Sequence, residues 1–277
     1  MPKNLTAFFS PKSVSIIGAS RTPGKVGYVI LKNLIDSGFK GEIYPINPSA
    51  KTILKKKCYK SISEVPETPD LIVISIPANT AGEVLNEIGE KGAKNVVIIS
   101  AGFKETGAEG QKLEKQLEEI SKKYEINLLG PNCLGFVNNE KLVNATFGKV
   151  SSPDGNISFI SQSGAIATSI FDWCCSIGLG FSHFVTLGNK TVIDESDVLE
   201  YLFQKNHGEV TSLFDEGPRK VNSIGLYLES ILDGPRFLEI SGKITQYDPV
   251  FIIKPGKTPA AATAMQSHTG AIAGADD

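Results

Sequence analysis

Several features that would mark a specialised protein are missing from this 277-residue sequence. No apolar run approaches the ~18 residues that a membrane-spanning helix needs, and the N-terminal stretch has no signal-peptide pattern. The net charge of −2 provides no excess of basic residues for binding nucleic acid or an anionic membrane. The four cysteines form no Cys-x-x-Cys pair and no zinc-ligand spacing. We therefore expect a cytoplasmic protein with no metal site, whose partners are neither nucleic acids nor membranes.

What the sequence does contain is a regular alternation of short apolar runs with longer helical patterns. In the first half, the runs lie at residues 14–18, 42–46, 71–75, 96–99 and 126–129. They are apolar throughout, which is typical of strands in a parallel sheet covered on both faces. Pro45 has no backbone N–H group, so the second strand is expected at an edge or end of the sheet.

A stretch rich in glycine, proline and asparagine at 130–152 interrupts this alternation, which then resumes. Further strands are predicted at residues 157–160, 181–187, 223–228 and 249–253. One face of the helix after the first of these is lined by Ile166, Ile170, Trp173 and Ile177. We predict an α/β protein with two consecutive doubly wound parallel-sheet domains.

The predicted division places a first domain at 1–130, a connector at 131–150 and a second domain at 151–277. The sequence stops abruptly, without a closing helix or strand. We therefore expect a fragment of a longer protein.

The first strand leads into a turn that could bind phosphate. Gly18-Ala19-Ser20 ends the strand, and Lys25 stands where the next helix begins. Such a turn offers backbone N–H groups to a phosphate, and the helix dipole and the lysine add favourable charge. The spacing matches neither G-x-G-x-x-G nor the Walker P-loop. A tight strand-to-helix connection without a ligand is the alternative.

Three later strands of the first half end in small or apolar residues. The residues at these strand ends are Asn47-Pro48, Ile76-Pro77 and Ala101. Ligands of open α/β sheets bind beyond the carboxyl ends of the strands. A nucleotide-type cofactor could therefore rest against these residues.

The second half opens with a sharper signal, Ser161-Gln162-Ser163-Gly164, between a strand and a helix. Hydroxyls and free N–H groups converge there on one helix N-terminus, which can hold a phosphoryl group or a phosphate ion. A capping serine followed by a packing glycine is the alternative. Asn132 belongs to a comparable turn at the end of the preceding strand, and Cys133 beside it is expected to be a small buried residue.

Glu229 and His268 form a candidate catalytic pair. Glu229 follows a predicted strand, where its carboxylate could accept from one ring nitrogen of an imidazole and leave the other nucleophilic. His268 lies among small residues after a Lys-Pro-Gly-Lys loop. The alternatives are a solvated glutamate and an ordinary loop histidine. His183 and His207 are expected to be structural or solvated.

Taken together, these residues resemble the α part of the NDP-forming acyl-CoA synthetases, especially the ADP-forming acetate–CoA ligases, and more distantly the α subunit of succinyl-CoA synthetase. The resemblance covers nearly the whole chain and keeps its order. It rests on Ile17–Ser20, Pro23–Gly27, Ile46–Pro48, Gly130–Gly135, Ser161–Gly164, Leu187–Lys190, Tyr227–Glu229 and Ser267–Gly270.

The resemblance implies a role for each candidate residue. The first domain is similar to the family's CoA-binding Rossmann-like domain, with Gly18, Ser20 and Lys25 at the CoA phosphates. The residues that fall at the CoA pocket are Asn47, Pro48, Ile76, Pro77 and Ala101. The second domain is similar to the flavodoxin-like ligase domain. There His268 matches the transiently phosphorylated histidine and Glu229 its carboxylate partner, while Ser161 and Ser163 match the phosphate-holding helix start.

The implied reaction interconverts acyl-CoA, ADP and phosphate with a carboxylic acid, CoA and ATP through acyl phosphate and phosphohistidine intermediates. No stretch resembles an ATP-grasp domain, so ATP or ADP and Mg²⁺ are expected on a partner subunit or domain, in a hetero- or homo-oligomer. A non-catalytic CoA-binding regulatory module is the alternative. Neither the acyl group nor the choice of ADP over GDP follows from these residues.

Overall fold

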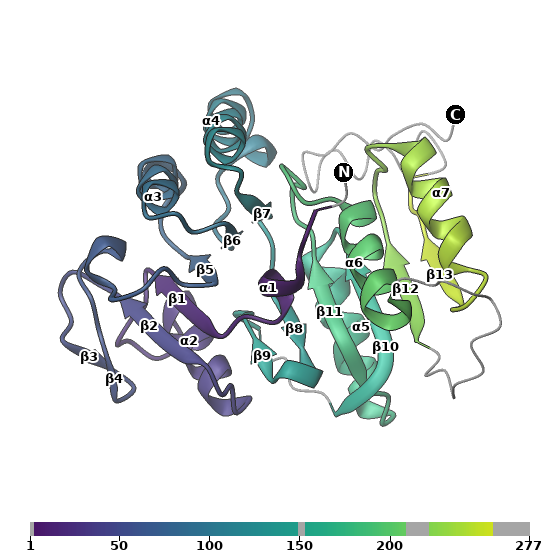
Figure 1. Cartoon of the computed structure of the whole chain (residues 1–277), viewed down its shortest axis with the longest axis horizontal. Helices are drawn as coiled ribbons and strands as arrows, with labels where there is room; N and C mark the ends of the chain where they lie inside the picture. The colour runs from purple at the N-terminus through teal and green to yellow at the C-terminus, as the bar shows by residue number, and fades with distance from the viewer. Residues whose placement is uncertain (1–2, 149–152, 209–221, 257–277) are drawn as a thin grey trace.

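The computed structural model describes residues 3–148, 153–208 and 222–256, so the predicted phosphohistidine His268 lies outside the described residues. Figure 1 shows two sheets side by side, the first half of the chain on the left and the second on the right. No helix in these three ranges is long and apolar enough for a membrane crossing.

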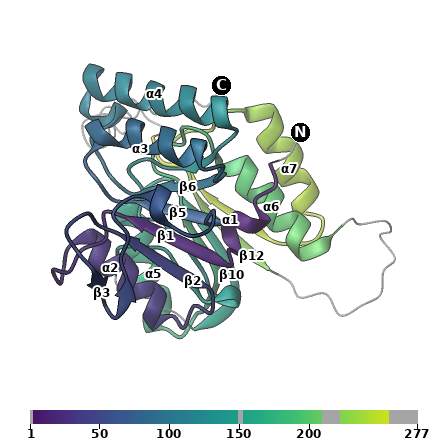
Figure 2. The same cartoon turned by 60° about the vertical axis from the view of Figure 1, so that its left-hand side comes forward.

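The first sheet has five parallel strands in the order β2-β1-β5-β6-β7. They are β1 (Ser13–Ile17), β2 (Glu42–Ile46), β5 (Leu71–Ile74), β6 (Asn95–Ile98) and β7 (Asn127–Leu129). Helix α2 (Val26–Asp36) covers one face, and α3 (Ala78–Glu90) and α4 (Ala108–Tyr124) cover the other (Figures 1 and 2). Every residue of β1, β5 and β6 is buried, as their continuous apolar runs predict.

The proline of β2 behaves as the sequence predicts. Pro45 lies in β2, and β2 is an edge strand of the first sheet. An edge strand needs ladder hydrogen bonds on one side only, so a missing N–H group is tolerated there.

The second sheet has six strands in the order β13-β12-β10-β11-β8-β9. They are β8 (Phe136–Asn138), β9 (Val143–Asn144), β10 (Asp154–Ser161), β11 (Phe181–Thr186), β12 (Ser223–Tyr227) and β13 (Val250–Ile253). Helix α5 (Gly164–Ser176) lies on one face, and α6 (Glu195–His207) and α7 (Gly234–Ile244) lie on the other (Figures 1 and 2). Strands β10 to β13 are parallel, which confirms the predicted fold class.

The stretch that sequence analysis treats as a connector contributes strands to the second sheet. Strands β8 and β9 pair antiparallel with each other, and β8 pairs antiparallel with β11. These strands are three and two residues long, too short for an apolar alternation to reveal them. The division at 130 and 151 stays a prediction.

Helix α5 is apolar on both of its sides. Ala167, Phe171 and Cys174 are its buried residues, whereas the sequence groups Ile166, Ile170, Trp173 and Ile177 on one face. That face points outward at Trp173, which is 62% exposed, and at Ile177, which is 54% exposed. Periodicity therefore finds the helix but does not choose its packed side.

A short N-terminal helix joins the two sheets. In α1 (Thr6–Phe9), the Phe9 ring lies 4.6 Å from that of Tyr201 and 5.0 Å from that of Phe136. The side-chain amide of Asn138 donates to the Phe9 carbonyl at 2.9 Å. One continuous hydrophobic cluster contains residues of both sheets, so the two halves of the chain share part of their core. The remaining short elements are β3 (Thr52–Ile53), β4 (Lys56–Lys57), η1 (Ile62–Glu64), η2 (Lys104–Thr106) and η3 (Asn139–Lys141).

Candidate functional site

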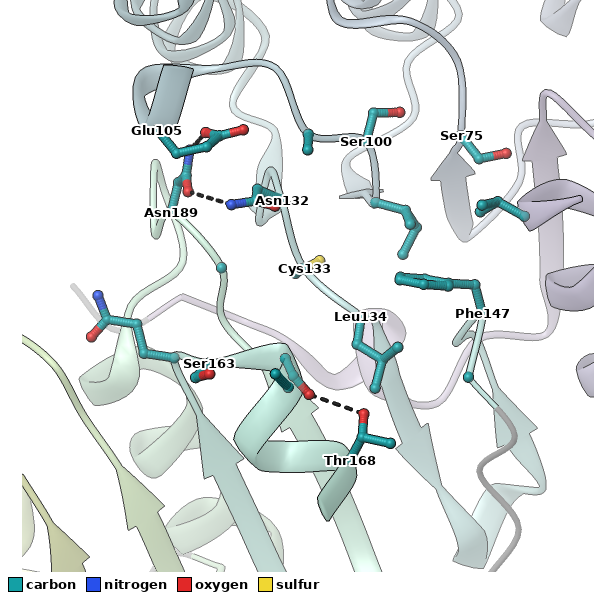
Figure 3. Close-up of a pocket in the computed structure, with 18 of the residues that line it drawn as sticks. Ser75, Ser100, Glu105, Asn132, Cys133, Leu134, Phe147, Ser163, Thr168 and Asn189 are labelled. Carbon is teal, nitrogen blue, oxygen red and sulfur yellow. Dashed lines mark hydrogen bonds between the residues drawn. The ribbon is translucent and has the colours of Figure 1, made fainter. Parts of the chain in front are cut away.

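A cavity of about 880 Å³ lies where loops at the carboxyl ends of the two sheets meet. In Figure 3, Ser163 and Thr168 belong to the second sheet's side, Ser75 and Ser100 to the first sheet's side, and Asn132 to Leu134 run between them. The lining residues are Val26, Ser75, Ile99, Ser100, Ala101, Lys104, Glu105, Asn132, Cys133, Leu134, Phe147, Gly148, Gln162, Ser163, Gly164, Ala165, Thr168, Gly188, Asn189 and Glu229. The cavity thus brings together five of the predicted site residues, namely Ala101, Asn132, Ser163, Gly164 and Glu229.

The start of α5 has one hydroxyl in the cavity wall and one buried beneath it. Ser163 is the N-cap residue, and its hydroxyl accepts from the Ile166 N–H group at 3.4 Å. Ser161 is fully buried, accepts from Ser163 N at 3.2 Å and donates to Ser163 O at 2.7 Å. The cap that sequence analysis weighs as the alternative is therefore present. It leaves the α5 N-terminus directed at the cavity, where an anion is stabilised by the helix dipole.

Glu229 is a buried carboxylate in the cavity wall. It lies two residues after the end of β12 and is 5% exposed, so the solvated alternative for this residue is wrong. Its backbone N–H group donates to Oε1 of Gln162 at 3.0 Å. Because parallel strands β10 and β12 are neighbours, their carboxyl ends place Glu229 beside the loop that starts α5.

Asn132 is joined to a polar cluster that crosses from one half of the chain to the other. Its Nδ2 lies 3.4 Å from Oδ1 of Asn189, as the dashed line in Figure 3 shows. Nδ2 of Asn189 donates to Glu105 at 2.8 Å and to Glu114 at 2.7 Å. Nζ of Lys104 donates to the Asn189 carbonyl at 2.6 Å. These bonds fix the loop after β11 against the first sheet's side of the cavity.

No sequence motif points to Lys104, Glu105 or Glu114 as site residues. Burial opposes ionisation of Glu105, but hydrogen bonds from Asn189 and the Gly102 and Phe103 N–H groups outweigh it and lower the pKa of that carboxyl. Glu105 therefore adds a stable negative charge to the cavity wall. Within the cluster, the sequence signal is that Asn189 stands in a motif that carries the family resemblance.

Cys133 is buried, as the sequence predicts. Its thiol donates to the Ile98 carbonyl at 3.4 Å, and burial raises its pKa to about 12. A thiol with such a pKa is not a nucleophile near neutral pH.

The turn after β1 is packed tightly by glycine and exposes its lysine. Gly18 has φ +89°, and a Cβ atom there would lie 2.5 Å from the Ser75 carbonyl oxygen. A Cβ atom at Gly27 would lie 2.0 Å from the Gly18 oxygen. Ser20 accepts from the Thr22 N–H group at 3.1 Å, and Lys25 is exposed at the start of α2. None of these residues lines the cavity, but Val26, next to Lys25, does.

The other predicted cofactor residues lie on loops around this turn. Nδ2 of Asn47 donates to the Ala19 carbonyl at 2.7 Å and so ties the loop after β2 to the turn after β1. Pro48 and Pro77 are exposed, and Ile76 is half-buried. Ala101 alone of the five residues Asn47, Pro48, Ile76, Pro77 and Ala101 lines the cavity.

The two histidines in the described ranges are structural. His183 is 1% exposed, and burial together with Lys205 lowers its pKa to about 3. Nε2 of His207 lies 2.8 Å from Oδ2 of the buried Asp248.

Two family models match the chain. A CoA binding domain matches residues 12–139, and a succinyl-CoA ligase like flavodoxin domain matches residues 154–277. The chain is 43% identical over 277 residues to the α subunit of ADP-forming acetate–CoA ligase I from Pyrococcus furiosus, a match that covers 99% of this chain and 57% of that one. It is 43% identical over 272 residues to the ADP-forming 4-hydroxybutyrate–CoA ligase of Nitrosopumilus maritimus, covering 97% of this chain and 37% of the ligase.

A solved structure shows the same fold. Dinucleotide-forming acetyl-coenzyme A synthetase 1 of Ca. Korarchaeum cryptofilum, in complex with phosphate and ADP, superposes with a TM-score of 0.87 at 37% identity. The match covers 98% of this chain and 56% of that structure, so the chain spans little more than half of it. The chain belongs to the NDP-forming acyl-CoA synthetase family, and over nearly its whole length it is similar to the α subunit of an ADP-forming acetate–CoA ligase.

Proposed function

We propose that this chain is the α part of an ADP-forming acyl-CoA ligase, with acetate as the first acid to test. The reaction interconverts acyl-CoA, ADP and phosphate with a carboxylic acid, CoA and ATP. The observation that carries the proposal is one cavity that holds the buried Glu229 and the N-terminus of α5. A carboxylate can orient an imidazole by accepting a hydrogen bond from it, and a helix N-terminus stabilises the negative charge of a phosphoryl group.

In the proposed mechanism, one nitrogen of His268 attacks the phosphorus of an acyl phosphate. The bond from phosphorus to the acyl oxygen breaks, and the carboxylate leaves with its electron pair. Glu229 accepts a hydrogen bond from the other ring nitrogen, which stabilises the positive charge that the ring gains. Ser163, Gly164 and Asn132 hold the phosphoryl oxygens. The phosphoryl group then passes from the imidazole to ADP.

CoA is proposed to bind along the turns of the first sheet. Gly18, Ser20 and Lys25 face its phosphates, and the loops at Asn47, Pro48, Ile76, Pro77 and Ala101 line its path. Support comes from the exposed position of Lys25 and from Val26, which joins this turn to the cavity. The thiol end of CoA would then reach the phosphoryl site through the cavity.

The nucleotide and Mg²⁺ are assigned to an ATP-grasp subunit or domain. The Pyrococcus relative is named as an α subunit, and the Ca. Korarchaeum structure is a complex with phosphate and ADP whose matched chain extends beyond the part that this chain covers. An assembly with such a partner is therefore part of the proposal.

The test is phosphate incorporation into the purified chain. The chain is mixed with acetyl-CoA, labelled phosphate and Mg²⁺, with and without an ATP-grasp subunit. We expect acid-labile, base-stable label that is absent from a His268→Ala variant. If no label appears with an active partner while CoA still binds, the ligase mechanism is wrong and a CoA-binding regulatory module is the better account.

A further inference from the structure

The side chain of Gln162 connects the α5 start to the loop that carries Glu229. Its Oε1 accepts from Glu229 N and from Ser230 N, each at 3.0 Å. Its Nε2 donates to Oγ of Ser230 at 3.2 Å. Gln162 stands between Ser161 and Ser163 in the chain, so one amide links the proposed phosphate-holding turn to the proposed imidazole partner.

A buried ion pair holds the same loop from its other side. Nζ of Lys190 lies 2.9 Å from Oε2 of Glu195, and both side chains are at most 1% exposed. Lys190 also donates to the Ser230 carbonyl at 2.6 Å, and Oε1 of Glu195 accepts from Leu232 N at 3.2 Å. Gln162 therefore binds the backbone N–H groups of residues 229 and 230, while the ion pair binds the carbonyl of residue 230 and the N–H group of residue 232.

A buried ion pair is in itself a weak source of stability. Removing two charges from water costs free energy that their attraction offsets only with good geometry and further hydrogen bonds. Here the further bonds all go to residues 230–232, next to Glu229. Lys190 also has φ +56°, a left-handed conformation that is unfavourable for a residue with a side chain. In this conformation its amine contacts the loop at the Ser230 carbonyl.

We propose that Gln162 is a positioning residue that fixes the carboxylate of Glu229 relative to the N-terminus of α5, with Lys190 and Glu195 supporting the same loop. The inference rests on the proposed function, because it assigns these residues a task in transfer of the phosphoryl group to His268. Transfer to an imidazole needs its orienting carboxylate and the phosphoryl group at a fixed separation. An error of about 1 Å in such a placement lowers a rate on the order of 100-fold.

The first test is Gln162→Met, which keeps the length of the side chain and removes its acceptor oxygen. With the ATP-grasp partner present, we expect labelling of His268 by acetyl-CoA and phosphate to slow on the order of 100-fold. The dissociation constant of CoA should stay unchanged. Gln111→Met, the same change at an exposed residue of α4, is the matched control and should label at the wild-type rate.

A double-mutant cycle shows whether Gln162 acts through Glu229. Glu229→Gln alone should slow labelling strongly, and adding Gln162→Met to it should slow labelling by less than about twofold more, because coupled residues are not additive. Equal penalties in both backgrounds would overturn the positioning role, since a merely structural effect does not depend on the Glu229 carboxylate.

The ion pair gives an independent test that leaves no buried charge unpaired. Lys190→Met with Glu195→Gln should slow labelling about tenfold while the chain stays folded. Lys205→Met with Glu140→Gln is the matched control, because this partly exposed pair, 2.7 Å apart, ties α6 to η3 away from the cavity. Wild-type labelling in the Lys190 and Glu195 double variant would remove these residues from the proposal.

The outcomes separate the two levels of inference. If the wild-type chain takes no label with an active partner, the proposed function fails. If the wild-type chain and Gln162→Met label equally fast, only the positioning role fails.

Discussion

Two strand-to-helix turns of this protein, one after β1 and one after β10, share a topology but are built by different means. The turn from Gly18 to Lys25 is shaped by close backbone contact, since glycine at two positions lets α2 approach the strand ends. The turn from Ser161 to Gly164 is shaped by hydrogen bonds that involve the buried Ser161 hydroxyl and the half-buried Gln162 side-chain amide. The first leaves its charged residue exposed, and the second faces a cavity that contains a buried carboxylate.

This difference follows from what each turn is proposed to hold. A phosphate that only anchors a ligand can be bound by exposed backbone N–H groups and an exposed lysine. A phosphoryl group that reacts needs groups whose positions are fixed before it arrives, because preorganised dipoles cost no reorganisation during the reaction. Buried, hydrogen-bonded side chains provide that.

The largest contrast is expected between Gly27→Ala and Gly164→Ala. A Cβ atom at Gly27 would lie 2.0 Å from a backbone oxygen, so α2 must move, whereas at Gly164 the nearest atom is 3.9 Å away. We expect Gly27→Ala to lower the free energy of unfolding by about 3 kcal/mol or more, and Gly164→Ala by less than about 1 kcal/mol. Urea denaturation of both variants measures this. Equal losses would mean that the second turn is also packed against its helix by backbone contact.

A smaller contrast is expected between Ser161→Ala and Ser20→Ala. Each serine accepts from the N–H group two residues later, at 3.2 Å for Ser161 and 3.1 Å for Ser20. Ser161 is fully buried, so its loss leaves the Ser163 N–H group without that acceptor and should cost about 2 kcal/mol. The bond of Ser20 is exposed, and water can replace it, so the cost should stay within about 0.5 kcal/mol.

The free energies of unfolding of these two serine variants show how much burial adds to the cost of losing the hydroxyl, because both serines make the same local hydrogen bond. A Ser161→Ala loss as small as that of Ser20→Ala would show that the hydroxyl does not hold the turn.

The parts of the site that the sequence predicts are those that follow from strand ends. Glu229 and Ser163 come at the carboxyl ends of parallel strands β12 and β10, and such ends converge on one edge of a sheet. Pro45 likewise predicts its edge position from a missing N–H group. In each case the inference needs only a strand and its neighbours in the chain.

The parts that it does not predict depend on contacts between distant segments. Asn189 forms hydrogen bonds with Glu105, 84 residues away in the chain, and with Glu114, 75 residues away. No local sequence pattern predicts such long-range contacts. The periodicity of apolar residues also does not predict which side of α5 is buried. Trp173 and Phe171 are both large and apolar, but only Phe171 is buried. Tertiary contacts decide both features.

The smallest expected effect concerns the exposed lysine of the first turn. Lys25→Met should weaken CoA binding by about fivefold, roughly 1 kcal/mol, because an exposed ion pair with a phosphate is screened by water and salt. Lys12→Met, an exposed lysine just before β1, is the matched control and should bind CoA as the wild type does. Calorimetric titration at low and high salt measures both.

The salt dependence separates an anchoring phosphate contact from a preorganised one. If Lys25 only anchors, the difference between Lys25→Met and the wild type should shrink as salt rises, since salt screens exposed charges over about 8 Å at physiological ionic strength. A large loss that is insensitive to salt would mean that CoA buries Lys25 on binding. In that case the first turn would fix its ligand as closely as the second, and the contrast between anchoring and reacting phosphate sites would not hold.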